Sequence, residues 1–423
     1  IKVSDAPKGT VLVARELTPS VTAGIVKENI AGIITETGGT TSHSAILARA
    51  LEIPAVLSVE GVASSLKNGD TVVVDGSEGA VIVNPDDNTV SEYSKKRDAF
   101  LAERKELENY RGRETKSASG EAYELFCNIG KPEDAVKAVD ADGEGVGLFR
   151  TEFLFMDRTS IPTEDEQFEA YKKAALILKG KSLIIRTLDI GGDKDIPYLG
   201  LEKEENPFMG FRAIRYCLKN RELFKSQIKA ILRASAFGDI KIMFPLITTM
   251  DELREGKKLV AECKADLRNM GINFNENIQV GVMVETASAA VIADMLAKEA
   301  DFFSIGTNDL TGYTMACDRG NNDVSYLYSP LQPSVLRMIK RTIECGVQNG
   351  ISVGMCGEAA ANKLMIPLLI SFGLTEFSVS APSVLNVRKI ISTWTKEEAD
   401  KVTAKVLEMS TQQEIVEYLK SVV

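Results

Sequence analysis

The only histidine of the 423-residue chain, His43, stands where an imidazole could accept a group from an anionic donor. It follows residues 38–42 (GGTTS), which predict a tight turn, and Leu47 and Leu51 follow it at the spacing of one buried helical face. Free backbone N–H groups in the first turn of a helix favour a bound anion, so His43 could carry a phosphoryl group. Taken alone, the segment also fits a helix-capping Ser42 beside a purely structural histidine.

Polar groups also follow apolar, strand-like segments in the later part of the chain. One such group is a weak indication, because many cap a helix or form a structural ion pair. Polar groups of both charge signs at five strand ends are hard to explain in that way. The five segments are 147–152 (GLFRTE), 184–194 (IIRTLDIGGDK), 283–286 (MVET), 306–309 (GTND) and 355–358 (MCGE).

The groups at these strand ends are cations, carboxylates and a thiol. Glu285 and Asp309 end neighbouring strands and offer hard oxygen ligands, which suit Mg²⁺ better than zinc. Cys356, on a glycine-rich turn, could serve as a general acid, although a buried cysteine is usually inert. Because arginine forks match both phosphate and carboxylate, a multiply charged anion could be held by Arg150, Arg186, Lys194 and, further on, Arg319.

The composition is that of a soluble globular chain with two or three domains, since 44% of its residues are hydrophobic and 26% are charged. It contains no run of 18 apolar residues and no basic, apolar leader, so we expect neither membrane insertion nor export. The six cysteines lack metal-site spacing and indicate free thiols in a reducing cytoplasm. A net charge of −10 argues against nucleic acid as a partner.

The elements that must position these groups indicate two domains and a linker. Residues 1–88 predict a small α/β domain, with strands at 11–14, 32–35, 55–57, 71–75 and 80–83 and a hairpin turn at 76–79. Residues 89–113 predict a helical linker, because eleven of the twenty residues from Ser94 to Arg113 are charged. This helix is either an interdomain arm or a surface helix packed on its neighbour.

Residues 114–423 predict a (βα)8 barrel. Helical segments at 163–178, 250–270, 287–298, 396–408 and 412–422 accompany eight apolar strands. An open, doubly wound sheet is the alternative, and the strand count favours closure. The strands are expected at 123–129, 145–153, 182–190, 240–247, 278–285, 302–307, 352–356 and 376–380.

The chain resembles enzyme I of the bacterial phosphoenolpyruvate:sugar phosphotransferase system. The resemblance is collinear and extends over essentially all 423 residues. The matching motifs are GGTTSHSAILARALEIPAV around His43, EGVGLFRTEFLFMDR around Arg150, RTLDIGGDKDIPY around Arg186, ENPFMGFRAIR around Arg212, VGVMVETASAA around Glu285, DFFSIGTNDLTGYTMACDRGN around Asn308 and GMCGE around Cys356.

This resemblance implies a role for each matching residue. His43 would accept the phosphoryl group of phosphoenolpyruvate through Nε2, while Thr22 orients the other ring nitrogen. Glu285 and Asp309 would bind Mg²⁺, and Cys356 would protonate the enolate carbon as pyruvate forms. The residues implied to hold phosphoenolpyruvate are Arg150, Arg186 and Arg319, with Lys194, Arg212, Asn308 and Asp309 in support.

The resemblance also implies partners. The family's α/β unit is swivelling, and a helical domain that docks the histidine-containing carrier protein HPr interrupts it. That domain and the first strand of the α/β unit match a region before Ile1, so we expect this chain to lack both. We therefore also expect phosphoryl transfer from this chain to the carrier to be inefficient. The missing initiator Met indicates a fragment, a processed form or a trimmed chain. The family generally dimerises through its barrel, so we expect a homodimer. Two alternatives remain. One is a dikinase or phosphoenolpyruvate synthase, although the sequence contains no nucleotide-binding fingerprint, and the other is a non-catalytic paralogue.

Overall fold

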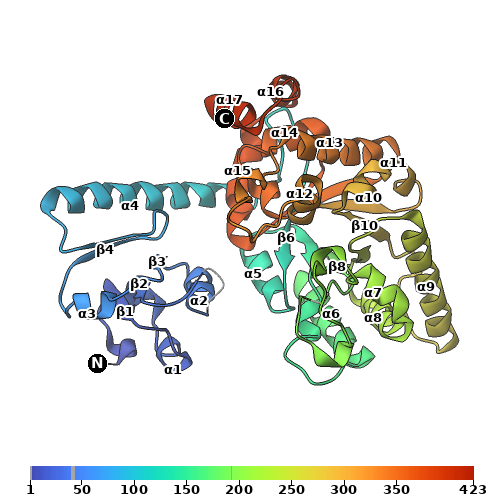
Figure 1. Cartoon of the computed structure of the whole chain (residues 1–423), viewed down its shortest axis with the longest axis horizontal. Coiled ribbons are helices and arrows are strands. Elements are labelled where there is room, and N and C mark those ends of the chain that lie inside the picture. The colour runs from blue at the N-terminus through green and yellow to red at the C-terminus, as the bar shows by residue number, and fades with distance from the viewer. Residues whose placement is uncertain (1, 40–42, 192) are drawn as a thin grey trace. The chain divides into compact units, whose positions relative to one another are not determined.

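Two units with different architectures make up the chain, and they divide between Glu106 and Leu107 (Figure 1). The computed structural model describes residues 2–39, 43–191 and 193–423. The helix α4 (Asp87–Leu107) runs up to this division and occupies most of the predicted linker.

The first unit combines a small parallel sheet with an antiparallel hairpin. The strands of the sheet lie in the order β1-β2-β3, and β4 pairs with β5 across the predicted turn. Its core centres on Leu17, Ile30, Ile33 and Ala48. The elements are β1 (Thr10–Ala14), α1 (Pro19–Thr22), β2 (Ile30–Thr35), α2 (His43–Leu51), β3 (Ala55–Val56), α3 (Val62–Ser65), β4 (Val72–Asp75) and β5 (Ala80–Val83).

The helix α2 begins at His43, as the sequence predicts, and its apolar residues reach the core of the first unit. Leu47 and Leu51 are half-buried and pack against that core, while Ala45 and Ala48 are buried. The predicted cap, Ser42, lies outside the described residues. The described backbone therefore places residue 43 in the first turn of a helix.

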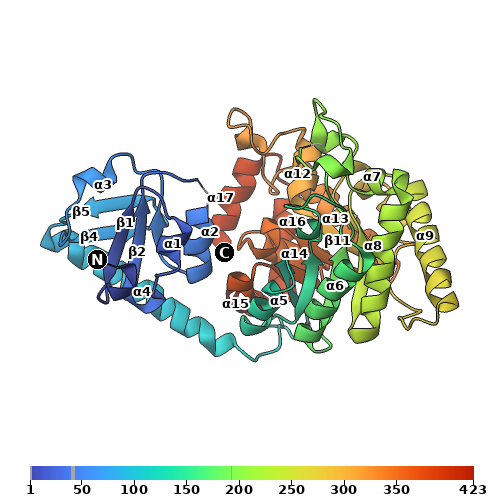
Figure 2. The same cartoon turned by 90° about the horizontal axis from the view of Figure 1, so that it is seen from below.

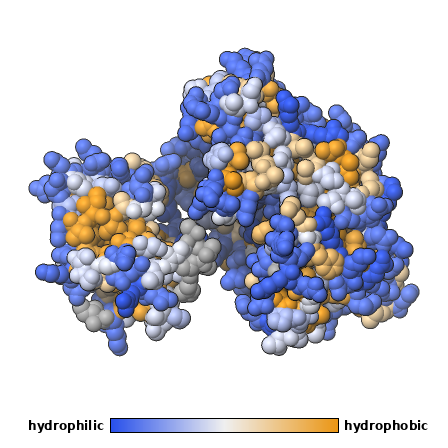
Figure 3. Space-filling model, viewed as in Figure 1, coloured by the Kyte–Doolittle hydropathy of each residue, from blue (hydrophilic) through white to orange (hydrophobic). Residues whose placement is uncertain are grey.

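The helix α4 agrees with its charged sequence, because none of its residues is buried. It begins at Asp87, two residues before the predicted linker, and one of its side chains, that of Arg104, forms an ion pair with Glu52. Hydrophobic surface in the first unit instead lies over β4, whose residues are only half-buried (Figure 3). A solvated helix thus follows a small, partly exposed α/β unit.

The second unit is a closed barrel of eight parallel strands, so the prediction of a barrel is confirmed and the open sheet is excluded (Figures 1 and 2). The strands are mostly apolar and buried, as expected when side chains fill the inside and helices cover the outside. The strands are β6 (Glu124–Ile129), β7 (Gly145–Phe149), β8 (Ser182–Arg186), β9 (Ile240–Phe244), β10 (Val280–Val284), β11 (Phe302–Gly306), β12 (Ser352–Cys356) and β13 (Glu376–Val379).

Helices surround this ring of strands. The single helix predicted over 287–298 is broken at Ile292, where ψ is 18°. Threonines cap several of the others, and Thr249 forms a full capping box with Glu252. The helices are α5 (Asp134–Asp140), α6 (Glu164–Leu178), α7 (Ile214–Lys219), α8 (Arg221–Ala234), α9 (Met250–Asn269), α10 (Ala287–Val291), α11 (Ala293–Leu296), α12 (Thr307–Met315), α13 (Pro333–Gln348), α14 (Ile366–Phe372), α15 (Val384–Thr393), α16 (Lys396–Val406) and α17 (Gln412–Val422).

Six strands each contribute one side chain to a buried cluster that is separate from the larger core. This cluster consists of Leu148, Ile184, Met243, Met283, Phe302 and Cys356. All six cysteines are free and buried, as the sequence predicts. Within the described residues, no helix has the length and apolar character needed to cross a membrane.

Candidate active site

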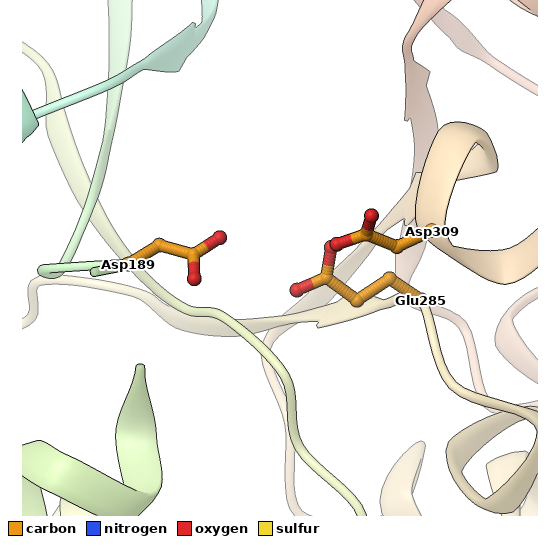
Figure 4. Close-up of side chains that lie close together, drawn as sticks. All are labelled: Asp189, Glu285 and Asp309. Atoms are coloured by element: carbon orange, nitrogen blue, oxygen red, sulfur yellow. The ribbon is translucent and has the colours of Figure 1, made fainter. Parts of the chain in front are cut away.

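Three carboxylates meet at the C-terminal rim of the barrel (Figure 4). Asp189 follows β8 by three residues, Glu285 directly follows β10, and Asp309 lies in the first turn of α12. One oxygen of each carboxylate lies within 4.8 Å of those of the other two. The side chain of Asp189 points across the rim toward the adjacent pair formed by Glu285 and Asp309. Because parallel strands end at one rim, groups distant in sequence converge here.

The backbone holds Glu285 in place from a neighbouring strand end. Its Oε1 accepts a hydrogen bond of 2.7 Å from the N–H of Leu246, and the side chain is buried. Leu246 adopts a left-handed conformation with φ of 56°, which is costly for a leucine and is characteristic of functional sites. Burial first, and then the charges of Asp309 and Asp189, raise the pKa of Glu285 well above its usual value. A cation beside Glu285 would relieve this repulsion.

Two arginines neutralise part of this negative charge. Arg186, the last residue of β8, pairs with Glu152 at 2.8 Å and with Asp189 at 3.5 Å. Arg212 pairs with Asp189 at 2.7 Å and reaches Asp309 at 3.6 Å. Burial opposes the charge of both guanidinium groups, but the neighbouring carboxylates outweigh it and raise the pKa of each arginine. Both arginines therefore remain cationic inside the site.

Arg150 differs from these two arginines because its side chain has no hydrogen-bond or ion-pair partner among the described residues. It directly follows β7, and its side chain is exposed. Desolvation and then the positive charge of Arg186 lower the pKa of Arg150. Arginine nevertheless stays protonated at neutral pH, so this guanidinium group, close to Arg186, is available to an anion.

Cys356 ends β12 and is buried under the same rim. Its Sγ accepts from the hydroxyl of Ser304 and donates to the carbonyl of Ile305, both at 3.7 Å. Burial raises the pKa of the thiol to about 11. Gly357 follows with φ of +112°, and a Cβ there would lie 2.5 Å from the Thr307 hydroxyl. The turn after Cys356 therefore requires glycine, and the thiol retains its proton at neutral pH.

The carboxylate cluster fits a divalent cation of the Mg²⁺ type. Its donors are hard carboxylate oxygens, and Mg²⁺ commonly takes one or two carboxylates together with substrate phosphate oxygens and water. Within the described residues this is the one group of three or more such side chains at ligand spacing. Asp189, Glu285 and Asp309 are the residues that could hold such a cation.

Comparison with known proteins decides the family. The family model described as "PEP-utilising enzyme, PEP-binding domain" matches residues 104–395, and the one described as "PEP-utilising enzyme, mobile domain" matches residues 6–79. The phosphoenolpyruvate-protein phosphotransferase of Bacillus subtilis (strain 168) is 51% identical over 410 residues, which are 97% of this chain and 72% of that protein. The chain belongs to the phosphoenolpyruvate-protein phosphotransferase family.

A second relative agrees with this membership. The phosphoenolpyruvate-protein phosphotransferase of Staphylococcus carnosus (strain TM300) is 47% identical over 413 residues, which are 98% of this chain and 72% of that protein. A solution structure of an Enzyme I protein, nEIt, is 50% identical and covers 24% of this chain and 41% of its own, with a TM-score of 0.23. The resemblance inferred from the motifs is therefore confirmed, and the chain is a phosphotransferase-family enzyme.

The structure brings together only part of the predicted site. Asn308 lies beside Asp309 in α12, and its backbone carbonyl accepts from the Tyr328 hydroxyl at 2.7 Å. Arg319 is exposed and pairs instead with Glu358 at 2.8 Å. Lys194 is exposed and makes no side-chain hydrogen bond or ion pair with any described residue.

In the first unit, the predicted groups are His43 and Thr22. The hydroxyl of Thr22 donates to the carbonyl of Pro19 at 2.9 Å, within its own helix. The side chain of His43 lies outside what the structure describes, so its contact with Thr22 stays a prediction.

Sequence reasoning assigned no role to Asp189 and Glu152, although both stand at strand ends. Glu152 accepts from Arg186 at 2.8 Å and from the N–H of Asp189 at 3.1 Å. The one sequence feature that could have indicated a role is their position near the arginines: Glu152 follows Arg150 in segment 147–152, and Asp189 follows Arg186 in segment 184–194. Their pairing partners could not be read from spacing, since Arg212 stands 23 positions from Asp189.

Proposed function

We propose that this enzyme transfers the phosphoryl group of phosphoenolpyruvate to His43 and releases pyruvate, and that the phosphoryl group then passes to the carrier protein HPr. The observation that carries the proposal is the convergence of Arg150, Arg186 and Arg212 with a carboxylate cluster at the barrel rim. The relatives' names favour this function over a dikinase or a non-catalytic paralogue.

The charges at the rim match the two anionic ends of phosphoenolpyruvate. Arg150 has no partner among the described residues, so its guanidinium group can bind phosphate or carboxylate without first breaking an ion pair. Arg186 and Arg212 are held by carboxylates at the same rim, and the Nε–H of Arg186 has no hydrogen-bond partner among the described residues. Lys194 and Arg319 are exposed, and we assign them a supporting role once substrate is present. Asn308 would add a polar contact.

Glu285 and Asp309 would hold Mg²⁺, whose bound form neutralises charge on the phosphate and enolate oxygens. Without that neutralisation, Glu285 and Asp309 would repel an anionic substrate. We therefore expect the anionic substrate to bind beside Glu285 and Asp309 only together with a cation.

The transfer step uses an imidazole nitrogen of His43 as nucleophile and the thiol of Cys356 as acid. A bond forms between this nitrogen and phosphorus as the bond between phosphorus and the bridging oxygen breaks, and the electron pair leaves with enolpyruvate. The C3 carbon of the enolate then takes the proton of Cys356, which gives pyruvate and a thiolate that solvent reprotonates. A pKa of about 11 keeps this thiol protonated beforehand.

The decisive experiment incubates the chain with ³²P-labelled phosphoenolpyruvate and Mg²⁺. We expect an acid-labile, base-stable label in the wild type and none in His43→Ala, because no other histidine exists in the chain. A label that survives in His43→Ala would overturn the assignment. Labelling by ATP in place of phosphoenolpyruvate would favour the dikinase alternative.

Two partner assignments extend the proposal. Onward transfer to HPr is tested by adding the carrier to the labelled enzyme and following the label to the carrier. We further propose that the barrel mediates a homodimer, and sedimentation of the full chain at several concentrations tests this.

A further inference from the structure

Asp189 takes no part in the proposed transfer, yet it lies beside four charged groups of the site. Its Oδ1 accepts from Arg212 at 2.7 Å, and its Oδ2 lies 3.5 Å from Arg186. Its side chain is only 6% exposed. One of its oxygens also lies within 4.8 Å of oxygens of Glu285 and Asp309. A single carboxylate thus adjoins the two arginines as well as the two other carboxylates, and Figure 4 shows it beside the latter.

The charges around Asp189 are unbalanced without a further cation. Four carboxylates (those of Glu152, Asp189, Glu285 and Asp309) face the two paired guanidinium groups of Arg186 and Arg212. When all are ionised, the set carries two more negative than positive charges, and the nearby Arg150 offsets only part of this excess. Uncompensated charge in a buried site is costly, so a divalent ion is the natural complement.

We propose that Asp189 is a positioning residue that couples the cation site to the arginines, by accepting hydrogen bonds from water on the cation while it orients Arg186 and Arg212. Both of its oxygens already face a guanidinium group, and each keeps a lone pair that can accept a hydrogen bond from water. Carboxylates in this outer position commonly tune metal affinity. The identity of the cation rests on the proposed function.

The test measures binding of Mn²⁺ alone to the full chain, without phosphoenolpyruvate, from the EPR signal of free Mn²⁺. Asp189→Asn keeps the size of the side chain and removes its charge, and we expect affinity to fall about 10-fold or more. Wild-type affinity in Asp189→Asn would overturn the inference. Because no turnover is measured, failure of the proposed phosphoryl transfer would show separately, in the labelling experiment.

Glu152→Gln is the matched control, because Glu152 also holds Arg186 but is not a member of the three-carboxylate cluster. We expect it to raise the KM for phosphoenolpyruvate and to change Mn²⁺ affinity less than twofold. An equal loss of Mn²⁺ affinity in Asp189→Asn and Glu152→Gln would show that Asp189 acts only through its negative charge, as Glu152 does. That result would overturn the proposed coupling role of Asp189.

A spectroscopic control and a third variant separate loss of charge from misfolding. Asp189→Asn weakens the partner of two buried arginines, so near-UV circular dichroism must confirm native packing of this variant. Asp189→Glu keeps the charge, and it should bind Mn²⁺ more tightly than Asp189→Asn. Equal affinities of these two folded variants would contradict the coupling.

Discussion

Cys356 shows how burial selects one protonation state for chemistry. Since burial raises the pKa of its thiol to about 11, the group remains protonated throughout the neutral range. That state suits a proton donor and does not suit a nucleophile, which needs the thiolate. The raised pKa therefore favours the acid role that the family resemblance implies.

Replacing Cys356 by alanine should slow release of pyruvate about 10²- to 10⁴-fold, the usual contribution of a positioned general acid. It should also abolish stereochemical control, because the released enolate then takes its proton from solvent on either face. The measurement uses phosphoenolpyruvate with a stereospecific deuterium label in tritiated water, followed by chirality analysis of the pyruvate methyl group. Retained chirality in Cys356→Ala would exclude the thiol as donor. Cys263→Ala, a buried cysteine on α9, is the control and should leave chirality intact.

The identities of most candidate residues could be predicted from the sequence, but their contacts could not. Arg150 and Cys356 stand directly at the ends of apolar segments, so residue type and spacing were enough to select them. The pairing of Asp189 with Arg212 depends on a loop that folds back over the barrel rim, which no local pattern encodes. Arg319 shows the opposite case. The sequence places it with the anion-binding arginines, whereas in the structure it forms an ion pair with Glu358.

At the scale of elements, all eight barrel strands were predicted because each is a short apolar run bounded by polar or glycine-rich segments. Their ends were predicted less well. The segment expected at 145–153 ends as a strand at Phe149, and that expected at 182–190 ends at Arg186. Beyond Phe149 and Arg186 the backbone leaves the paired strands, and the side chains of Glu152 and Asp189 can face Arg186. Apolar residues recur after the polar ones, at Phe153 beyond β7 and at Leu188 and Ile190 beyond β8, so the sequence does not mark where each strand ends.

One strand carries a carboxyl group inside the barrel, at its opposite end. Glu376 begins β13 and is buried, and its Oε1 has no hydrogen-bond partner among the described residues. A Cβ at Gly147 would lie 2.4 Å from that oxygen, so the glycine makes room for the carboxyl group. Burial and then the charge of Glu124, opposed by Lys241, raise the pKa of Glu376 to about 8.

This raised pKa predicts a pH-dependent stability. The folded state prefers the protonated acid, so stability is greatest below the usual pKa of 4.5 and falls as pH rises toward about 8. Glu376→Gln mimics the protonated form and should be more stable than wild type at pH 8.5, by on the order of 3–5 kcal/mol. Near pH 5 the two should differ little. Urea unfolding at both pH values checks this, with the exposed Glu417→Gln as control, and an equal gain at both values would contradict it.

At the scale of the whole molecule, the proposed reaction needs groups from both units. His43 begins a helix of the first unit, while the arginines and carboxylates belong to the barrel. The helix α4, which has no buried residue, is the covalent connection between them. A tether of this kind makes an otherwise bimolecular encounter intramolecular and raises the effective concentration of one reactant at the other.

Cutting the tether should therefore change the kinetic order of the reaction. A protease site inserted in α4 between Lys96 and Arg97, two exposed residues, can be cleaved in the folded protein. Before cleavage, the rate of His43 phosphorylation per mole of enzyme should not depend on enzyme concentration in the micromolar range. After cleavage, if the two pieces separate on gel filtration, it should fall in proportion to dilution, because each transfer then requires a collision. The uncleaved insertion variant controls for the insertion itself, and circular dichroism confirms that both pieces remain folded. A concentration-independent rate from separated pieces would show that His43 does not receive its phosphoryl group at the barrel.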